Sequence, residues 1–168
     1  MSKIQSADLP DGICVVTQPA RRNTGKPHTR SIVKILSALM SVSILTANLS
    51  PDAALRDLCE VNELNRSGVG KTPWRMALYF LTYQARLCAA LWRRDETVIL
   101  FFGTTTYLLP IVFARIIGKR VIIQPRGDVP LSLQLSWERQ VPPTIAAALA
   151  GTVRCLEHLS YRTAHALI

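Results

Sequence analysis

Two short polar turns hold the residues of this sequence that are best suited to binding a ligand. Gly103 and Thr104 follow the apolar run Val98–Phe102, and Arg126 and Asp128 follow a second apolar run further along the chain. Hydroxyl, guanidinium and carboxylate groups form hydrogen bonds and ion pairs with polar ligands. We expect any ligand site of this protein to be built from these two turns, and we assign no catalytic side chain.

A basic loop between residues 18 and 30 is a candidate for binding an anion. Gly25 and Lys26, preceded by two arginines, come just before a helix that we expect over Ser31–Met40. The free N–H groups at a helix N-terminus bind anions, and nearby cations strengthen such a site. A solvated basic loop would explain the same residues, so both interpretations stay open. The dinucleotide pattern G-x-G-x-x-G is missing.

The segment from Asn65 to Thr72 almost matches a phosphate-binding P-loop. It reads Asn-Arg-Ser-Gly-Val-Gly-Lys-Thr, with asparagine where the pattern needs the first glycine. That glycine makes the tight turn around the phosphates. The strand expected before the loop is interrupted by Asn62 and Glu63, and the run Val98–Phe102 is followed by glycine rather than by an aspartate that could hold magnesium. We therefore interpret this segment as a basic, glycine-containing loop ahead of a helix.

The two polar turns are positioned by a predicted strand–helix–strand unit. The runs Val98–Phe102 and Val121–Ile123 are apolar throughout, which is typical of parallel strands covered by helices on both faces. A helix is expected between them over Tyr107–Ile117, and the carboxyl ends of parallel strands share one edge of the sheet. The alternative is a membrane span in the uncharged run from Val98 to Ala114, which Gly103 and Pro110 would interrupt.

Predicted strands and helices also alternate along the rest of the chain. We therefore predict an α/β fold, namely a Rossmann-like parallel sheet with helices on both faces. We expect one domain over residues 1–168. Its further strands are expected at Ile13–Thr17, Val42–Leu49, Val61–Leu64 and 164–168, its further helices at Ala53–Glu60, Pro73–Arg94 and Thr144–Thr163, and a loop at 129–143. The last strand ends without a turn, which suggests a chain that continues in its natural form or a truncated product.

The long helix expected over Pro73–Arg94 has one apolar stripe and one basic surface. The stripe, which we predict to face the core, consists of Leu78, Leu81, Ala85, Cys88, Ala89 and Trp92. The rest of the helix carries arginines and aromatic residues, with no acid before Asp95. Such a surface can lie against an anionic membrane, although a solvated helix in a basic protein explains it equally well.

Composition fits a globular, basic protein. Of its 168 residues 49% are hydrophobic and 18% charged, and the net charge is +9, which favours phosphate-bearing partners. The four cysteines have no metal-binding spacing, so we predict free, buried thiols and no metal site. Residues 1–12 lack the apolar segment of a secretory signal, which predicts a cytoplasmic protein, peripheral at the inner membrane face if the basic helix docks there.

The order of these elements resembles the N-terminal half of a GT-B glycosyltransferase of the family 4 (group 1) type. The likeness covers nearly the whole chain and is carried by Ile13–Thr17 with its loop to Arg30, by Thr97–Thr106, by Lys119–Asp128, and by the closing Tyr161-Arg-Thr-Ala-His-Ala-Leu-Ile. Each motif is weak alone, and the order and spacing carry the resemblance.

The resemblance implies an acceptor-binding half of a retaining enzyme that transfers a sugar from a nucleotide-sugar donor to a glycan or lipid-linked acceptor. Gly103, Thr104, Arg126 and Asp128 would line the acceptor cleft, and Gly25 and Lys26 would face the donor diphosphate. Arg126 would pair with an acceptor phosphate or carboxylate, and Asp128 with sugar hydroxyls. The domain itself would hold no cofactor. The donor-binding C-terminal domain is absent from these residues, so the chain alone should be inactive.

Two departures from the family pattern bear on this interpretation. Relatives often have a Gly-Gly pair in the first loop, where this chain has Gly25 among basic residues, and a histidine near Gly103, where this chain has none. A different class of protein also stays open, namely a basic Rossmann-like module that binds nucleic acid or another polyanion. Its basic residues are not interleaved with aromatics on strands, as binders of single-stranded nucleic acid require.

Overall fold

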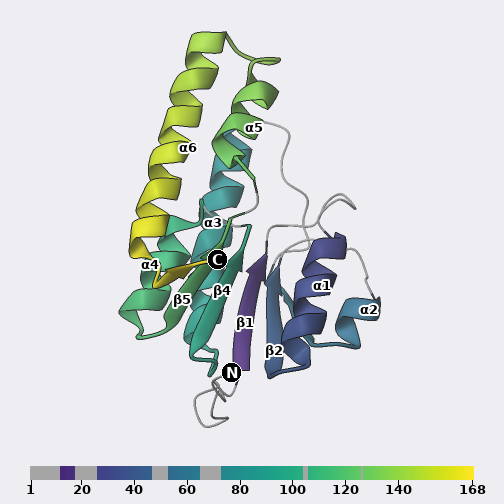
Figure 1. Cartoon of the computed structure of the whole chain (residues 1–168). Coiled ribbons are helices and arrows are strands. Elements are labelled where there is room, and N and C mark those ends of the chain that lie inside the picture. Colours follow the sequence, from purple (N-terminus) through teal and green to yellow (C-terminus); the bar gives the residue numbers. More distant parts are fainter. Residues whose placement is uncertain (1–11, 18–25, 47–52, 65–72, 104–105, 126) are drawn as a thin grey trace, which may run out of the picture.

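The computed structural model describes residues 12–17, 26–46, 53–64, 73–103, 106–125 and 127–168. These residues form a six-stranded sheet in the order β3-β2-β1-β4-β5-β6, and every neighbouring pair is parallel (Figure 1). The strands are β1 (Gly12–Thr17), β2 (Ser41–Thr46), β3 (Glu60–Glu63), β4 (Val98–Phe102), β5 (Arg120–Gln124) and β6 (Ala166–Leu167). The predicted parallel, Rossmann-like sheet is confirmed, including the adjacent pair β4 and β5.

Six helices within the described residues cover the two faces of the sheet. They are α1 (Lys26–Ser37), α2 (Ala53–Arg56), α3 (Pro73–Trp92), α4 (Leu108–Ile116), α5 (Val129–Trp137) and α6 (Pro143–Thr163). Helices α5 and α6 lie side by side and rise above the carboxyl edge of the sheet (Figure 1). Among the described residues, no helix is long and apolar enough to cross a membrane.

The central strands have apolar side chains on both sides because a separate core lies on each face of the sheet. Along β1, Cys14 and Val16 belong to the core shared with α3 and α4, whereas Ile13 and Val15 belong to the core shared with α1 and α2. Strand β4 alternates in the same way, and all five of its residues are buried. Successive side chains of a strand point to opposite faces of the sheet. A strand between two cores is therefore apolar on both faces.

The predicted core stripe of the long helix is wrong. Leu78, Leu81 and Trp92 are 52%, 54% and 68% exposed, whereas Tyr83, Leu87 and Leu91 are at most 1% exposed. The helix is apolar around most of its circumference, so two stripes of helical spacing compete, and the spacing alone cannot choose between them. The packing against α4 and the sheet selects the stripe that carries Tyr83 and Leu87.

The predicted loop over residues 129–143 is also wrong, since α5 occupies most of it. Asp128 caps this helix, and Pro130 lies in its first turn, where a proline removes no helical hydrogen bond. Helix α1 likewise begins at Lys26 rather than Ser31, with Pro27 in its first turn. The expected helix at 53–60 is a single turn. In each of the first two cases the proline marks a helix start.

The four cysteines differ in exposure, so the prediction of buried thiols holds only in part. Cys14 is buried in β1, and burial raises the pKa of its thiol to about 12. Cys59 and Cys88 are half-buried, while Cys155 is exposed on α6, and all four are free. Within the described parts of the chain, no group of three or more histidine, cysteine or acidic residues could hold a metal ion.

We predict that Leu87→Ala destabilises the protein strongly and that Leu81→Ala does not. The Leu87 side chain is fully buried, and its removal leaves a cavity that should lower the free energy of unfolding by about 2–5 kcal/mol. Leu81 lies on the same helix but is 54% exposed, so it serves as a matched control with an expected change of less than about 1 kcal/mol. Urea unfolding followed by circular dichroism measures both. A larger loss for Leu81→Ala would contradict the observed orientation of α3.

Candidate functional site

The order of the strands places the candidate site at the carboxyl ends of β1 and β4. The chain winds outward from β1 in one direction through β2 and β3 and in the other through β4, β5 and β6, so the order reverses between β1 and β4. Thr17 at the end of β1 pairs in register with Phe102 at the end of β4. Open parallel sheets bind their ligands in the crevice outside such a reversal.

Two buried threonines tie strand ends together at this edge. The Thr17 hydroxyl donates to the Thr46 hydroxyl over 3.0 Å, and the two residues are 5% and 0% exposed. The backbone N–H of Leu64 donates to the carbonyl of Thr46 over 2.9 Å, which connects the end of β3. The carboxyl ends of β1, β2 and β3 are therefore held in fixed relative positions beneath the candidate site.

Gly103 occupies a turn that a residue with a side chain would strain. Its φ is 67°, in the left-handed region, and its N–H donates to the carbonyl of Gln124 over 2.9 Å. This hydrogen bond continues the pairing of Phe102 with Gln124 one residue past the end of β4. The first polar turn thus begins directly beside the end of β5, where the second turn starts.

Asp128 has a structural role at the start of α5. Its Oδ1 accepts a hydrogen bond from the N–H of Leu131 over 2.9 Å, so the carboxylate is the N-cap of the helix. The preceding Gly127 has a φ of 74°, which turns the chain into the helix. Asp128 is exposed, and within the described residues its second carboxylate oxygen accepts no hydrogen bond. The fold therefore uses one of the two carboxylate oxygens.

The structure describes three of the six predicted site residues. The structure brings Gly103 and Asp128 to the same edge of the sheet, at the ends of the neighbouring strands β4 and β5. Lys26 is the first residue of α1, the helix that follows β1. Gly25, Thr104 and Arg126 lie outside the described residues, as does the P-loop-like segment 65–72. The assignment of these residues to an acceptor or a donor phosphate stays a prediction.

A cluster of tyrosines lies next to the first turn, on the α3 face of the sheet. The ring of Tyr107, just ahead of α4, meets that of Tyr83 edge-on with centroids 5.6 Å apart, and Tyr79 stacks on Tyr83 at 6.2 Å. The Tyr83 hydroxyl is buried, and it has no hydrogen-bond partner among the described residues. Burial raises the pKa of the Tyr83 and Tyr107 hydroxyls, so both stay neutral at ordinary pH.

Gln84 orients the helix that follows the first turn, although no motif in the sequence indicates this role. Its Oε1 accepts a hydrogen bond from the N–H of Leu109 over 3.2 Å, at the start of α4, and the residue is only 4% exposed. Tyr107 at the N-cap position provides no side-chain hydrogen bond to the helix. A side chain on α3 therefore satisfies a free N–H group of α4, which no local pattern around residue 109 could reveal.

Comparison with solved structures supports the fold. A glycosyltransferase described as that of kitacinnamycin is similar over 83% of this chain, with a TM-score of 0.51 and 18% identity. A sugar transferase from Siraitia grosvenorii, in complex with UDP, is similar over 89% of this chain, with a TM-score of 0.53 and 12% identity. The C-terminal domain of a hydrogenase from Pyrococcus furiosus is similar over 67%, with a TM-score of 0.52 and 12% identity.

These similarities define the fold and leave the activity open. The chain spans 38% and 42% of the length of the two glycosyltransferases, but 89% of the hydrogenase domain. No protein-family model and no curated protein sequence matches this chain. The sheet is of the Rossmann-like kind that glycosyltransferases contain, and proteins of other activities share it.

We predict that Asp128→Ala and Asp128→Asn differ in their effect on stability. Alanine removes the cap of α5 and should lower the free energy of unfolding by about 0.5–2 kcal/mol. Asparagine keeps an oxygen that can accept from the N–H of Leu131, and aspartate and asparagine are both good N-caps. This substitution should therefore change the free energy of unfolding by less than about 0.5 kcal/mol. Thermal or urea unfolding of the two variants provides the measurement. Equal losses would show that the charge, rather than the hydrogen bond, stabilises this helix.

Proposed function

We propose that this chain is the acceptor-binding part of a glycosyltransferase. The single observation that carries the proposal is that Gly103 and Asp128 lie at the carboxyl ends of neighbouring parallel strands, beside the reversal of strand order. The order of elements along the chain, the resemblance of its motifs to those of GT-B enzymes and the shared fold of two solved glycosyltransferases support it. The N-terminal position of this domain within such an enzyme is part of the proposal.

The proposed reaction is transfer of a sugar from a nucleotide-sugar donor to a glycan or lipid-linked acceptor, with retention at the anomeric carbon. Arg126 pairs with a phosphate or carboxylate of the acceptor, and the second oxygen of Asp128 accepts hydrogen bonds from its hydroxyls. Gly25 and Lys26 face the donor diphosphate in this proposal, which is favoured by the basic residues that precede α1 in the sequence and by the lack of an acidic residue in the first turn of this helix. A second domain, outside these 168 residues, holds the nucleotide.

We predict that Asp128→Asn weakens binding of the acceptor without destabilising the protein. Asparagine keeps the helix cap but loses the charge, so the hydrogen bonds to ligand hydroxyls should weaken by about 1.5–3 kcal/mol, or roughly tenfold or more in affinity. Amide NMR spectra of the 168-residue chain, titrated with methyl glycosides and sugar phosphates, measure the affinity and the residues that respond.

Glu138→Gln provides the matched control for this titration. Glu138 is an exposed acid at the opposite end of the same helix, where it accepts a hydrogen bond from Gln134, so its replacement removes an equal charge away from the site. The proposal fails if no glycoside shifts the amides of Gly103 or Asp128, or if both variants lose affinity equally. Turnover of a nucleotide sugar by the chain alone would contradict the assignment of the donor site to a second domain.

We further propose that the exposed face of α3 contacts an anionic membrane, which would bring a lipid-linked acceptor to the site. Leu78, Leu81 and Trp92 form an exposed apolar stripe, and Trp92 extends it to Phe113 of α4, with ring centroids 6.3 Å apart. Exposed arginines flank the stripe at positions 75, 86 and 93, and α3 carries no acid. Apolar side chains with a basic border suit insertion into the headgroup region of an anionic bilayer.

We predict that Leu81→Gln weakens sedimentation with anionic vesicles and that Ile35→Gln does not. Ile35 is 64% exposed on α1, on the opposite face of the sheet, so the two changes remove similar apolar surface from different faces. Loss of one inserted leucine should weaken binding by about 1–2 kcal/mol, or roughly tenfold. Equal affinity of both variants would refute contact through α3. Tight, salt-sensitive binding of RNA with no binding of vesicles would instead favour a polyanion-binding module.

A further inference from the structure

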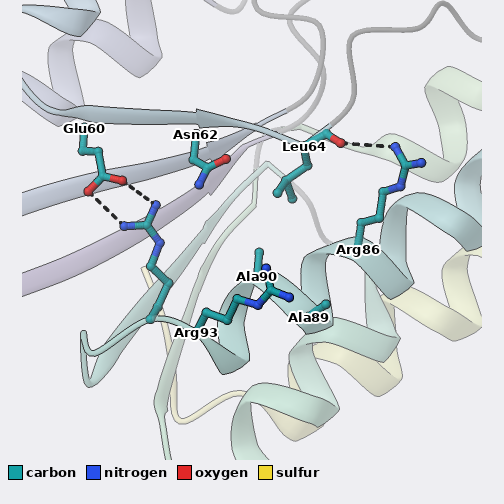
Figure 2. A pocket seen from close by; sticks show the side chains of 8 residues that line it. Glu60, Asn62, Leu64, Arg86, Ala89, Ala90 and Arg93 are labelled. Atoms are coloured by element: carbon teal, nitrogen blue, oxygen red, sulfur yellow. Dashed lines mark hydrogen bonds and ion pairs between the residues drawn. The ribbon is translucent and has the colours of Figure 1, made fainter.

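A pocket of about 500 Å³ lies between the edge strand β3 and α3, away from the reversal of strand order (Figure 2). The side chains of Asn62 on β3 and of Leu64, just after it, form one wall. The helix provides the other wall and the floor, with Arg86, Ala89 and Ala90, followed by Arg93 just past its end, and Arg94 and Glu60 close one end. The volume lies within the range of about 300–1,000 Å³ that is usual for small-molecule sites.

The alternation of β3 and two small residues on α3 create this space. Val61 packs into the core on the α1 face, and Glu63 pairs with Arg56 on that side, so Asn62 and its neighbours two residues away face α3. Opposite them the helix has Ala89 and Ala90, whose side chains are too short to reach the strand. Larger residues at these positions would close the pocket, as the exposed location of Ala89 would allow.

The three arginines of the pocket differ in how many of their N–H groups already donate hydrogen bonds within the protein. Arg94 is held by Glu60 through two hydrogen bonds of 3.0 and 3.1 Å, and the bonded guanidinium lowers the pKa of Glu60. Arg86 makes a single bond of 3.3 Å to the carbonyl of Leu64. Within the described residues, the side chains of Arg93 and Asn62 have no hydrogen-bond partner. A guanidinium has five N–H donors, so most of those on Arg86 and Arg93 remain available.

These available donors border one space. Figure 2 shows Asn62 on the strand facing the helix, with Arg86 on the helix and Arg93 just past its end, at either side of Ala89 and Ala90. Three arginines against one glutamate leave a formal charge of +2 on the lining side chains. A phosphomonoester carries about −1.5 to −2 at pH 7 and three acceptor oxygens, so it matches this charge, whereas one carboxylate would neutralise only part of it.

We infer that this pocket binds the phosphate of a phosphomonoester. The dianion is held by the free donors of Arg86, Arg93 and the Asn62 amide, and the carbon part of the ligand lies against Leu64, Ala89 and Ala90. The Arg94–Glu60 pair is the rigid end of the site. The group belongs either to a small soluble phosphate or to the headgroup of a phosphomonoester lipid. This inference does not depend on the proposed transferase function.

Titration of the 168-residue chain with glycerol 3-phosphate tests the soluble ligand. Amides of residues 62 and 86–94 should shift, and Arg93→Gln should weaken binding about tenfold, since it removes a charge-assisted hydrogen bond. Ala89→Met should weaken binding similarly by filling the pocket, with no change of charge and only a small loss of helix propensity. Arg154→Gln, an equal loss of charge at an exposed position of α6, should leave the affinity within about twofold.

Vesicles test the lipid headgroup. Phosphatidylcholine vesicles containing phosphatidic acid are compared with vesicles that contain phosphatidylglycerol at equal surface charge, because only phosphatidic acid is a monoester. Loss of affinity in Arg93→Gln and Ala89→Met for glycerol 3-phosphate identifies a soluble ligand, and a loss confined to phosphatidic acid vesicles identifies a headgroup. The inference is overturned if neither probe binds, or if Arg154→Gln weakens binding as much as Arg93→Gln does.

Discussion

The burial of β1 on both faces is the constraint on which the other elements depend. Cys14, Val15 and Val16 are fully excluded from solvent, so every N–H and C=O group of this strand must be paired within the protein. Strand β2 pairs with one edge and β4, which is distant in sequence, pairs with the other. Because β1 lies between them, the chain must leave it in two directions, and the reversal of strand order between β1 and β4 follows from that arrangement.

The same constraint explains which parts of the fold could be predicted from the sequence. A strand between two cores is apolar at every position, and this pattern identified the strands β1, β4 and β5 and their parallel pairing. The orientation of α3 could not be predicted, because Leu81 and Leu87 belong to competing stripes of equal spacing and tertiary packing chooses between them. The starts of α1 and α5 were predictable in principle, since a proline in the first turn favours a helix start.

Some parts of the candidate site could likewise be predicted from the sequence, and others could not. Gly103 and Asp128 could be assigned to one edge of the sheet because each follows an apolar strand, and parallel strands end on the same side. The pairs Thr17–Thr46 and Gln84–Leu109 could not, since their members are 29 and 25 residues apart and meet only in the folded chain. The pocket between β3 and α3 also depends on tertiary structure. Asn62 and Arg93 line the same space only when α3 packs beside the edge strand.

The charges of β3 also affect how the folded protein behaves at high concentration. Among the described residues, this strand is an edge of the sheet, and the outer side of an edge strand can pair with a strand from another molecule. Glu60 and Glu63 carry charge on opposite faces of the strand, and each is anchored by an arginine from the same chain, Arg94 and Arg56. An incoming strand would have to pack against both ion pairs. The edge strand therefore carries its own protection against aggregation through sheet extension.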